Sequence, residues 1–207
     1  MAAFPSSCPP SPRRVDARRN RETILRVADE VFAESAEFAS LDEVARRAGL
    51  GRATVYRHFP DRHALGVAIA DRHVAAIRAA VRCCLDGELP LRDLLRAILS
   101  AQVTRRPLVR LFQEMPPGEQ LRHVGVLTRE LEPAFHQSQA RGELRPDLVI
   151  ADLELVFEMI EGAMATGPYT RDRVASTQRL VVAVVDGLFA PAGHRGAVED
   201  PSAPHQG

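Results

Sequence analysis

A cluster of chemically active side chains occupies residues 48–65, which read AGLGRATVYRHFPDRHAL. Tyr56, His58 and His63 are of the types that transfer protons in general acid–base catalysis. The three arginines of the same stretch are of the type that binds phosphate groups. The stretch therefore suits either an acid–base site or a phosphate-binding surface, and the elements that position it must decide between the two.

The overall composition permits a folded protein and excludes a strongly basic one. The chain has 207 residues, of which 45% are apolar and 26% are charged, as in ordinary globular domains. The 27 basic residues are all arginine and are balanced by 27 acidic residues, so the formal net charge is zero. Because a general basic excess is missing, any affinity for nucleic acid must come from a local surface.

The cysteines and the ends of the sequence indicate where the protein resides. Cys8, Cys83 and Cys84 are odd in number and unsuited to a disulfide framework, which favours a reducing compartment. Prolines interrupt the first 15 residues where a secretory signal needs an apolar core, and no apolar run approaches the ~20 residues of a membrane helix. We therefore expect a cytoplasmic protein with no membrane partner, and disordered ends at residues 1–15 and 191–207.

Apolar residues recur at helical spacing almost throughout the chain between these ends, and we find neither strand alternation nor an internal repeat. We predict an all-α fold whose first helix spans residues 16–35. Ser40 and Glu43 form a capping box, in which the serine accepts from a first-turn amide and the glutamate reaches back, so the second helix begins at Leu41. Gly49 ends this helix in the left-handed conformation.

The third helix begins at Gly51 or Arg52 and must end near His58, because Pro60 disfavours helical geometry at the residue before it. Two helices of about two turns each, joined by a short link, form a helix-turn-helix. Helical periodicity places Val55 and Phe59 on the inward face of the third helix. The outward and flanking residues are Arg52, Ala53, Thr54, Tyr56 and Arg57.

A larger helical body follows the motif. We predict six further helices at residues 61–85, 91–104, 108–114, 118–141, 146–165 and 170–189, which makes about nine in total. Pro133 falls inside one of them and should kink it. The predicted domains are therefore residues 16–62 and residues 63–190. The last two helices are the most apolar, and such faces either fill a core or join two subunits.

The segment SLDEVARRAGLGRATVYRHFPDRHAL, residues 40–65, resembles the DNA-binding motif of the tetracycline-repressor (TetR) family of bacterial transcription regulators. The resemblance rests on Ala45, the Ala48-Gly49 turn, the segment from Thr54 to Phe59, and the basic residue that follows three places later. It implies an N-terminal three-helix DNA-binding domain followed by a larger helical domain for effector binding and dimerisation. The partners implied are a double-stranded DNA operator, a second copy of the chain and a small-molecule effector.

The resemblance also assigns roles to single residues. It implies base contacts from Arg52, Ala53 and Tyr56 and phosphate contacts from Thr54, Arg57, His58 and Arg62, and we add Ser40 to the candidate DNA-binding residues. The chain departs from the family pattern in three places. Gly51 replaces the usual serine-like cap, Ala36 replaces a typical glycine in a shortened link, and acidic Asp42 and Glu43 stand near a position where some members have a base-reading arginine. The last departure argues against groove contact from the second helix.

The body offers candidates for two further sites. Large or polarizable side chains that could line an effector pocket, or simply pack the core, are Phe112, Met115, Phe135, His136, Phe157 and Met159. Apolar residues that could form a dimer interface are Leu155, Val174, Leu180, Val181, Val184, Val185 and Leu188. The histidines are scattered without metal-ligand spacing, so we expect no metal and no cofactor.

The leading hypothesis is a homodimeric repressor that a small-molecule effector releases from a pseudo-palindromic operator. Two alternatives remain. One is an activator or architectural DNA-binding protein without an effector. The other is an all-helical enzyme that uses Cys83 or Tyr56 with a histidine, although the nucleophile elbow, the phosphate-binding glycine loop and the paired carboxylates of common enzymes are missing. Arginines at residues 13–21 could enter a minor groove, but a solubilising tail is the preferred interpretation.

Overall fold

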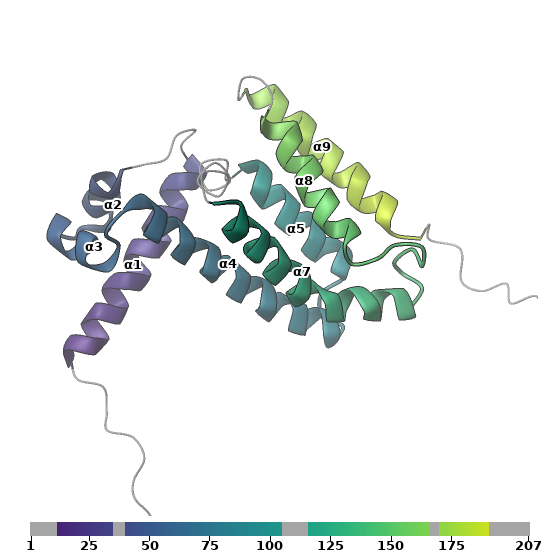
Figure 1. The fold of residues 1–207 in the computed structure, drawn as a ribbon, viewed down its shortest axis with the longest axis horizontal. Helices are drawn as coiled ribbons and strands as arrows, with labels where there is room; N and C mark the ends of the chain where they lie inside the picture. The colour runs from purple at the N-terminus through teal and green to yellow at the C-terminus, as the bar shows by residue number, and fades with distance from the viewer. Residues whose placement is uncertain (1–11, 35–39, 105–115, 166–169, 191–207) are drawn as a thin grey trace, which may run out of the picture. The chain divides into compact units, whose positions relative to one another are not determined.

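The computed structural model describes residues 12–34, 40–104, 116–165 and 170–190 (Figure 1). Within these ranges the chain forms eight α-helices, and its only β-type pairing there is an isolated antiparallel bridge between Leu144 and Phe189. The all-α fold predicted from the sequence is thus confirmed. The helices are α1 (Pro12–Glu34), α2 (Leu41–Ala48), α3 (Arg52–His58), α4 (Arg62–Leu85), α5 (Leu91–Thr104), α7 (Pro117–Ala140), α8 (Asp152–Ala165) and α9 (Arg171–Leu188).

The chain divides into two compact units, which we call the head and the body. The head comprises residues 1–76 and 104–122, and the body comprises residues 77–103 and 123–207. Helices α4 and α7 each contribute residues to both units. The predicted helix at residues 108–114 lies outside the described residues.

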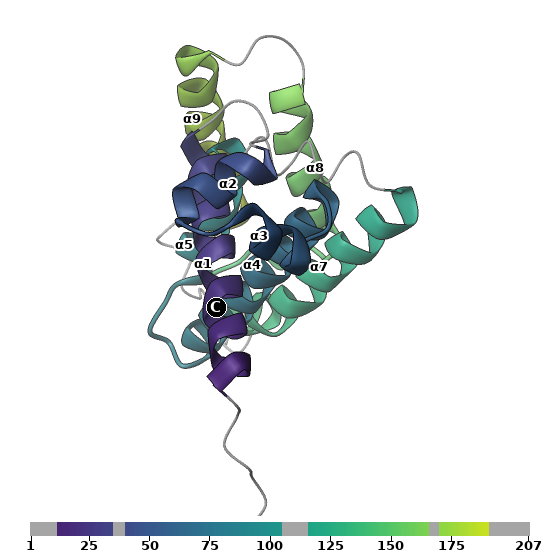
Figure 2. The ribbon, with the colours of Figure 1, turned by 90° about the vertical axis from the view of Figure 1, so that its left-hand side faces the viewer.

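The head core is built by the apolar stripes of its helices. Val44 and Ala45 of α2 and Val55 of α3 are almost completely buried, so the two short helices pack closely. Figure 2 shows α2 crossing α1, with α3 following after a short turn. The buried residues of this core are Ile24, Leu25, Val27, Ala28, Val31, Leu41, Val44, Ala45, Val55, Phe59, Leu65, Ala68 and Ile69.

The ends of α2 are set by local signals. The Ser40 hydroxyl accepts a hydrogen bond from the Glu43 amide at 3.2 Å, as predicted. Gly49 ends the helix with a φ of 64°, a conformation that favours glycine. The predicted return bond from the Glu43 side chain is wrong, because that carboxylate accepts hydrogen bonds from Arg46 and Arg47 instead.

Polar contacts join the helices of the body around a second apolar core. Arg78 of α4 forms an ion pair with Glu130 of α7. Arg92 and Arg96 of α5 both approach Asp186 of α9, at 3.2 and 3.1 Å. The largest completely buried side chains of this core are Leu95, Leu99, Leu131, Phe135, Leu144, Leu153 and Ile160.

Two predicted helix boundaries were wrong. The first helix begins at Pro12 rather than at residue 16, since proline fits the first helical position. The helix predicted from residue 146 begins only at Asp152, because other bonds hold the intervening segment. The Gln139 amide donates to the carbonyls of Arg145 and Leu148, and Leu144 pairs with Phe189. None of the described helices combines the length and apolar character that a membrane span requires.

Candidate nucleic-acid interface

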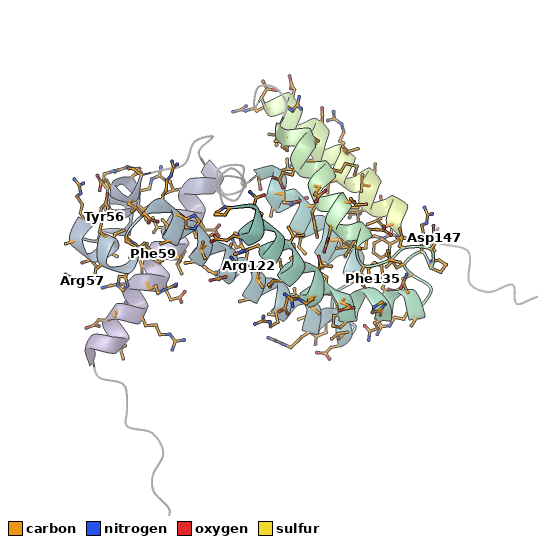
Figure 3. All side chains as sticks on the ribbon, in the orientation of Figure 1. Tyr56, Arg57, Phe59, Arg122, Phe135 and Asp147 are labelled. Atoms are coloured by element: carbon orange, nitrogen blue, oxygen red, sulfur yellow. The ribbon has the colours of Figure 1, made fainter. Side chains whose placement is uncertain are left out.

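Helix α3 presents two distinct faces. Val55 and Phe59 are 0% and 2% exposed and pack into the head core, whereas the outward side chains are open to solvent. In Figure 3, Arg57 lies at the outer edge of the head and Phe59 lies closer to α1. The helical phase predicted from the sequence is therefore correct. Arg52, Ala53, Tyr56 and Arg57 are exposed, and Thr54 and His58 are half-buried.

The N-terminus of α3 is exposed and has no side-chain cap. Its N-cap is Gly51, which adopts an extended conformation and forms no side-chain hydrogen bond. The free first-turn amides of a helix favour an anion such as a phosphate. The hydroxyl oxygen of Ser40, at the start of α2, accepts a hydrogen bond from the Glu43 amide.

An acidic residue of α2 binds two of the candidate base-reading residues of α3. Asp42 Oδ2 lies 2.8 Å from Arg52 Nη2, and the Tyr56 hydroxyl donates to Asp42 Oδ1 at 3.2 Å. No sequence pattern predicted this bridge, because the partners are 10 and 14 positions apart and meet only when α2 and α3 pack. The one available signal was the spacing of Arg52 and Tyr56, which places them on the same side of a helix.

The second acidic residue of α2 forms a separate local cluster. Glu43 accepts hydrogen bonds from Arg46 and Arg47, and these bonds lower the pKa of Glu43 to about 2, although desolvation opposes the shift. The bond to Glu43 likewise raises the pKa of Arg46. The two arginines are exposed and Glu43 is half-buried, and ion pairs at these spacings stabilise a helix, here one of only eight residues.

The candidate acid–base residues Tyr56, His58 and His63 are not paired with one another in the described contacts. Tyr56 binds Asp42, while His63 lies 3.6 Å from Glu119 and His58 lies beside the Phe59 ring. Each of the three side chains thus contacts a different neighbour, which gives no support to a shared proton-transfer site. Arg62 is exposed at the first position of α4.

Comparison with known proteins decides between these interpretations. The family described as "Bacterial regulatory proteins, tetR family" matches residues 24–69, which include the whole helix-turn-helix. A crystal structure of the TetR transcription regulatory protein from Mycobacterium vanbaalenii is 30% identical, with a TM-score of 0.60 over 86% of this chain and 100% of that one. The chain belongs to the TetR family. It is a DNA-binding transcriptional regulator.

Other relatives of this TetR-family chain differ in their direction of control. FasR of Mycolicibacterium smegmatis, a transcriptional activator, is 34% identical over 42% of this chain and 41% of FasR. LfrR of the same species, a transcriptional repressor, is 36% identical over 48% of this chain and 52% of LfrR. The match thus spans about half, or less, of these curated relatives. The TetR regulator SCO0520 from Streptomyces coelicolor is 29% identical, with a TM-score of 0.59 over 83% of this chain and 99% of that one.

The candidate pocket residues of the TetR-family body fall into three groups. Phe135 and Phe157 are buried in the body core, at 0% and 4% exposure. His136 and Met159 are exposed on the surface of their helices. Phe112 and Met115 lie outside the described residues. Of the described candidates, only Phe135 and Phe157 therefore face the interior of the body.

The candidate dimer residues also divide by burial. Leu155 of α8 and Leu180 of α9 are 64% and 41% exposed, whereas Val174, Val181, Val185 and Leu188 contribute to the chain's own core. Val181, Val185 and Leu188 are buried, and Val174 and Val184 are half-buried. Sequence reasoning missed Val182, which is 42% exposed on α9.

The described residues offer little for metal or thiol chemistry. They contain no group of three or more histidine, cysteine or acidic side chains arranged to hold a metal ion. Cys84 is buried and Cys83 is half-buried. Burial raises the pKa of the Cys84 thiol, and the neighbouring Cys83 raises it further, which disfavours the reactive thiolate.

Proposed function

We propose that the protein is a homodimeric repressor that binds a pseudo-palindromic operator through α3 and leaves it when a small molecule binds the body. The proposal rests on the outward face of α3, where exposed Arg52, Ala53, Tyr56 and Arg57 overlie the buried Val55. Arginine can bind guanine O6 and N7 together in the major groove, and a small alanine permits close approach to the bases.

Dimerisation through α8 and α9 would place two copies of α3, one from each subunit, on one duplex. Helices α8 and α9 pack against each other within the subunit and leave large apolar side chains exposed. Burying apolar surface between two copies would stabilise the dimer by about 25 cal/mol per Å². Two recognition helices must then lie roughly 34–36 Å apart to enter successive major grooves. The exposed apolar residues are Leu155, Met159, Leu180 and Val182.

Release by an effector requires a ligand that binds the two states of the dimer with different affinity. One body residue supports an internal ligand contact. Gln102 Oε1 is buried and accepts no hydrogen bond within the described part of the chain. A buried acceptor without a partner costs about 1–3 kcal/mol, and a ligand with a suitably placed donor would remove this cost. No cofactor is part of the proposal.

A DNA-selection experiment tests the proposal. The full chain is incubated with a pool of random-sequence duplexes, and the bound fraction is sequenced over successive rounds. We expect enrichment of an inverted repeat, with affinity that falls steeply as salt concentration rises. Sedimentation of the enriched complex should give two chains per duplex. Enrichment of no sequence would contradict the proposal.

The direction of control is the second part of the test, because FasR is an activator and LfrR a repressor. In vitro transcription from a promoter that contains the enriched site distinguishes the two. We expect the protein to reduce transcript yield, and a release screen with small molecules to restore it. An increased yield would favour the activator alternative.

A further inference from the structure

The Asp42 carboxylate uses both of its oxygens to hold residues of α3. Oδ2 pairs with Arg52 Nη2 at 2.8 Å, and Oδ1 accepts from the Tyr56 hydroxyl at 3.2 Å. Arg52 and Tyr56 are four residues apart on one helix and therefore lie on the same side of it. A single acidic side chain thus connects two residues of the outward face.

The fold of the head does not depend on this bridge. The α2–α3 packing is provided by buried Val44, Ala45 and Val55. By contrast, the Arg52 side chain is 70% exposed and the Asp42 side chain is 42% exposed. Ion pairs with such exposure stabilise proteins only slightly. The main effect of Asp42 should therefore appear in what α3 presents to a ligand.

The bridge restricts the hydrogen bonds that Arg52 and Tyr56 can offer. The guanidinium has further N–H donors beyond the one directed at Asp42, so it can still donate to guanine O6 and N7. The Tyr56 hydroxyl has one hydrogen, and Asp42 accepts it. Towards DNA this hydroxyl can therefore only accept, which suits an exocyclic amino group of adenine or cytosine and disfavours a phosphate oxygen.

The negative charge of Asp42 also favours sequence-specific over general DNA binding. Asp42 neutralises Arg52 at short range, so Arg52 should contribute less to general attraction for phosphates than a lone arginine does. A long side chain that is already ordered also loses less conformational entropy when it binds a base. Both effects lower affinity for arbitrary DNA relative to affinity for the correct site.

We propose that Asp42 is a specificity-determining residue, which positions Arg52 and Tyr56 for base reading without contacting a base itself. The inference rests on the proposed role of α3 in operator recognition. It predicts that removing the carboxylate lowers sequence discrimination while general DNA affinity stays equal or rises. Loss of a merely structural residue would instead lower both.

The test compares four full-length proteins in the random-duplex selection: wild type, Asp42→Ala, Arg52→Ala and the double variant. Positions at which Arg52→Ala loses base preference define the bases read by Arg52. We expect Asp42→Ala to lose preference at the same positions, roughly 2- to 10-fold, the range for ordering one long side chain. In the Arg52→Ala background, Asp42→Ala should have no further effect at those positions.

Glu43→Ala is the matched control, because it removes an equal charge from the same helical turn but has its partners on α2. We expect Glu43→Ala to preserve the wild-type base preferences. Thermal unfolding verifies that every variant is folded. The inference would be overturned by an Asp42→Ala profile equal to wild type, or if, at the positions read by Arg52, Asp42→Ala had as large an effect in the Arg52→Ala background as in the wild-type background. Failure of wild type to enrich any sequence would instead refute the proposed function.

Discussion

His73 Nε2 of α4 lies 3.1 Å from Asp29 Oδ1 of α1, so the two helices are joined by a polar contact inside the head. Both side chains are largely shielded from solvent, at 25% and 20% exposure. A contact of this kind stabilises the packing of α1 on α4, because it compensates for the partial desolvation of both groups.

We expect His73→Ala to lower the free energy of unfolding by about 1–3 kcal/mol, the range for removing one partner of a shielded hydrogen bond. Chemical denaturation at neutral pH measures this loss. Arg72→Ala, at the preceding and exposed position of α4, is the control and should change stability little. Equal effects of the two substitutions would show that the contact is unimportant.

Backbone conformation at Gly49 yields a second prediction. A β-carbon at this position would meet no atom within 4 Å, so only the φ of +64° opposes a side chain. Gly49→Ala should therefore destabilise the protein by about 1–2 kcal/mol. Gly162→Ala is the opposite control, because Gly162 is exposed within α8 and also has open space around it. We expect it to stabilise the protein by about 0.5–1 kcal/mol.

The Glu43 cluster predicts a pH-dependent contribution to stability. Bonds from Arg46 and Arg47 lower the pKa of Glu43 from 4.5 to about 2. Because the folded-state pKa is depressed, the stabilisation is fully present above the ordinary pKa and is lost as pH falls towards 2. The difference in melting temperature between wild type and Glu43→Gln should therefore shrink as pH falls from 5 to about 2. A difference in melting temperature that stays constant over this pH range would contradict the prediction.

Substitution of Arg57 tests whether this residue of α3 contacts a DNA phosphate. We expect Arg57→Ala to weaken binding to all duplexes about equally and to reduce the slope of log affinity against log salt by about 0.9, the value for one phosphate contact. Fluorescence anisotropy over a range of salt concentrations measures this slope. Arg72→Ala removes an exposed arginine from α4 and should leave the slope unchanged. A loss of base preference in Arg57→Ala would contradict a phosphate role.

A charged substitution among the exposed apolar residues of α8 and α9 tests whether they form the dimer interface. Leu155→Arg should convert the dimer into monomers, because it places a charge in a surface that dimerisation would bury. Subunit stability should be retained, since Leu155 is 64% exposed in the single chain. Sedimentation velocity gives the oligomeric state. Val15→Arg, at a 50% exposed position of α1, is the control and should remain dimeric.

Local signals in the sequence determined much of the head. Ser40, Gly49 and Pro60 act on residues within one helical turn of themselves, so the bounds of α2 and α3 could be predicted from them directly. The inward placement of Val55 and Phe59 likewise followed from helical geometry alone. The start of α8 could not be predicted in this way, because Gln139 binds the carbonyls of Arg145 and Leu148 and prevents an earlier helix.

Tertiary structure alone decided which apolar and polar residues meet. In α9, Leu180 and Val181 are both apolar, yet only the second is buried, because one side of the helix packs into the body core. The Asp42 bridge to Arg52 and Tyr56 exists because α2 and α3 cross, a relationship between residues 10 and 14 positions apart. The sequence by itself determined the family, the bounds of α2 and α3 and the outward face of α3, since these depend on local patterns of residues. The hydrogen bonds that this face can offer to DNA depend on contacts that only folding creates.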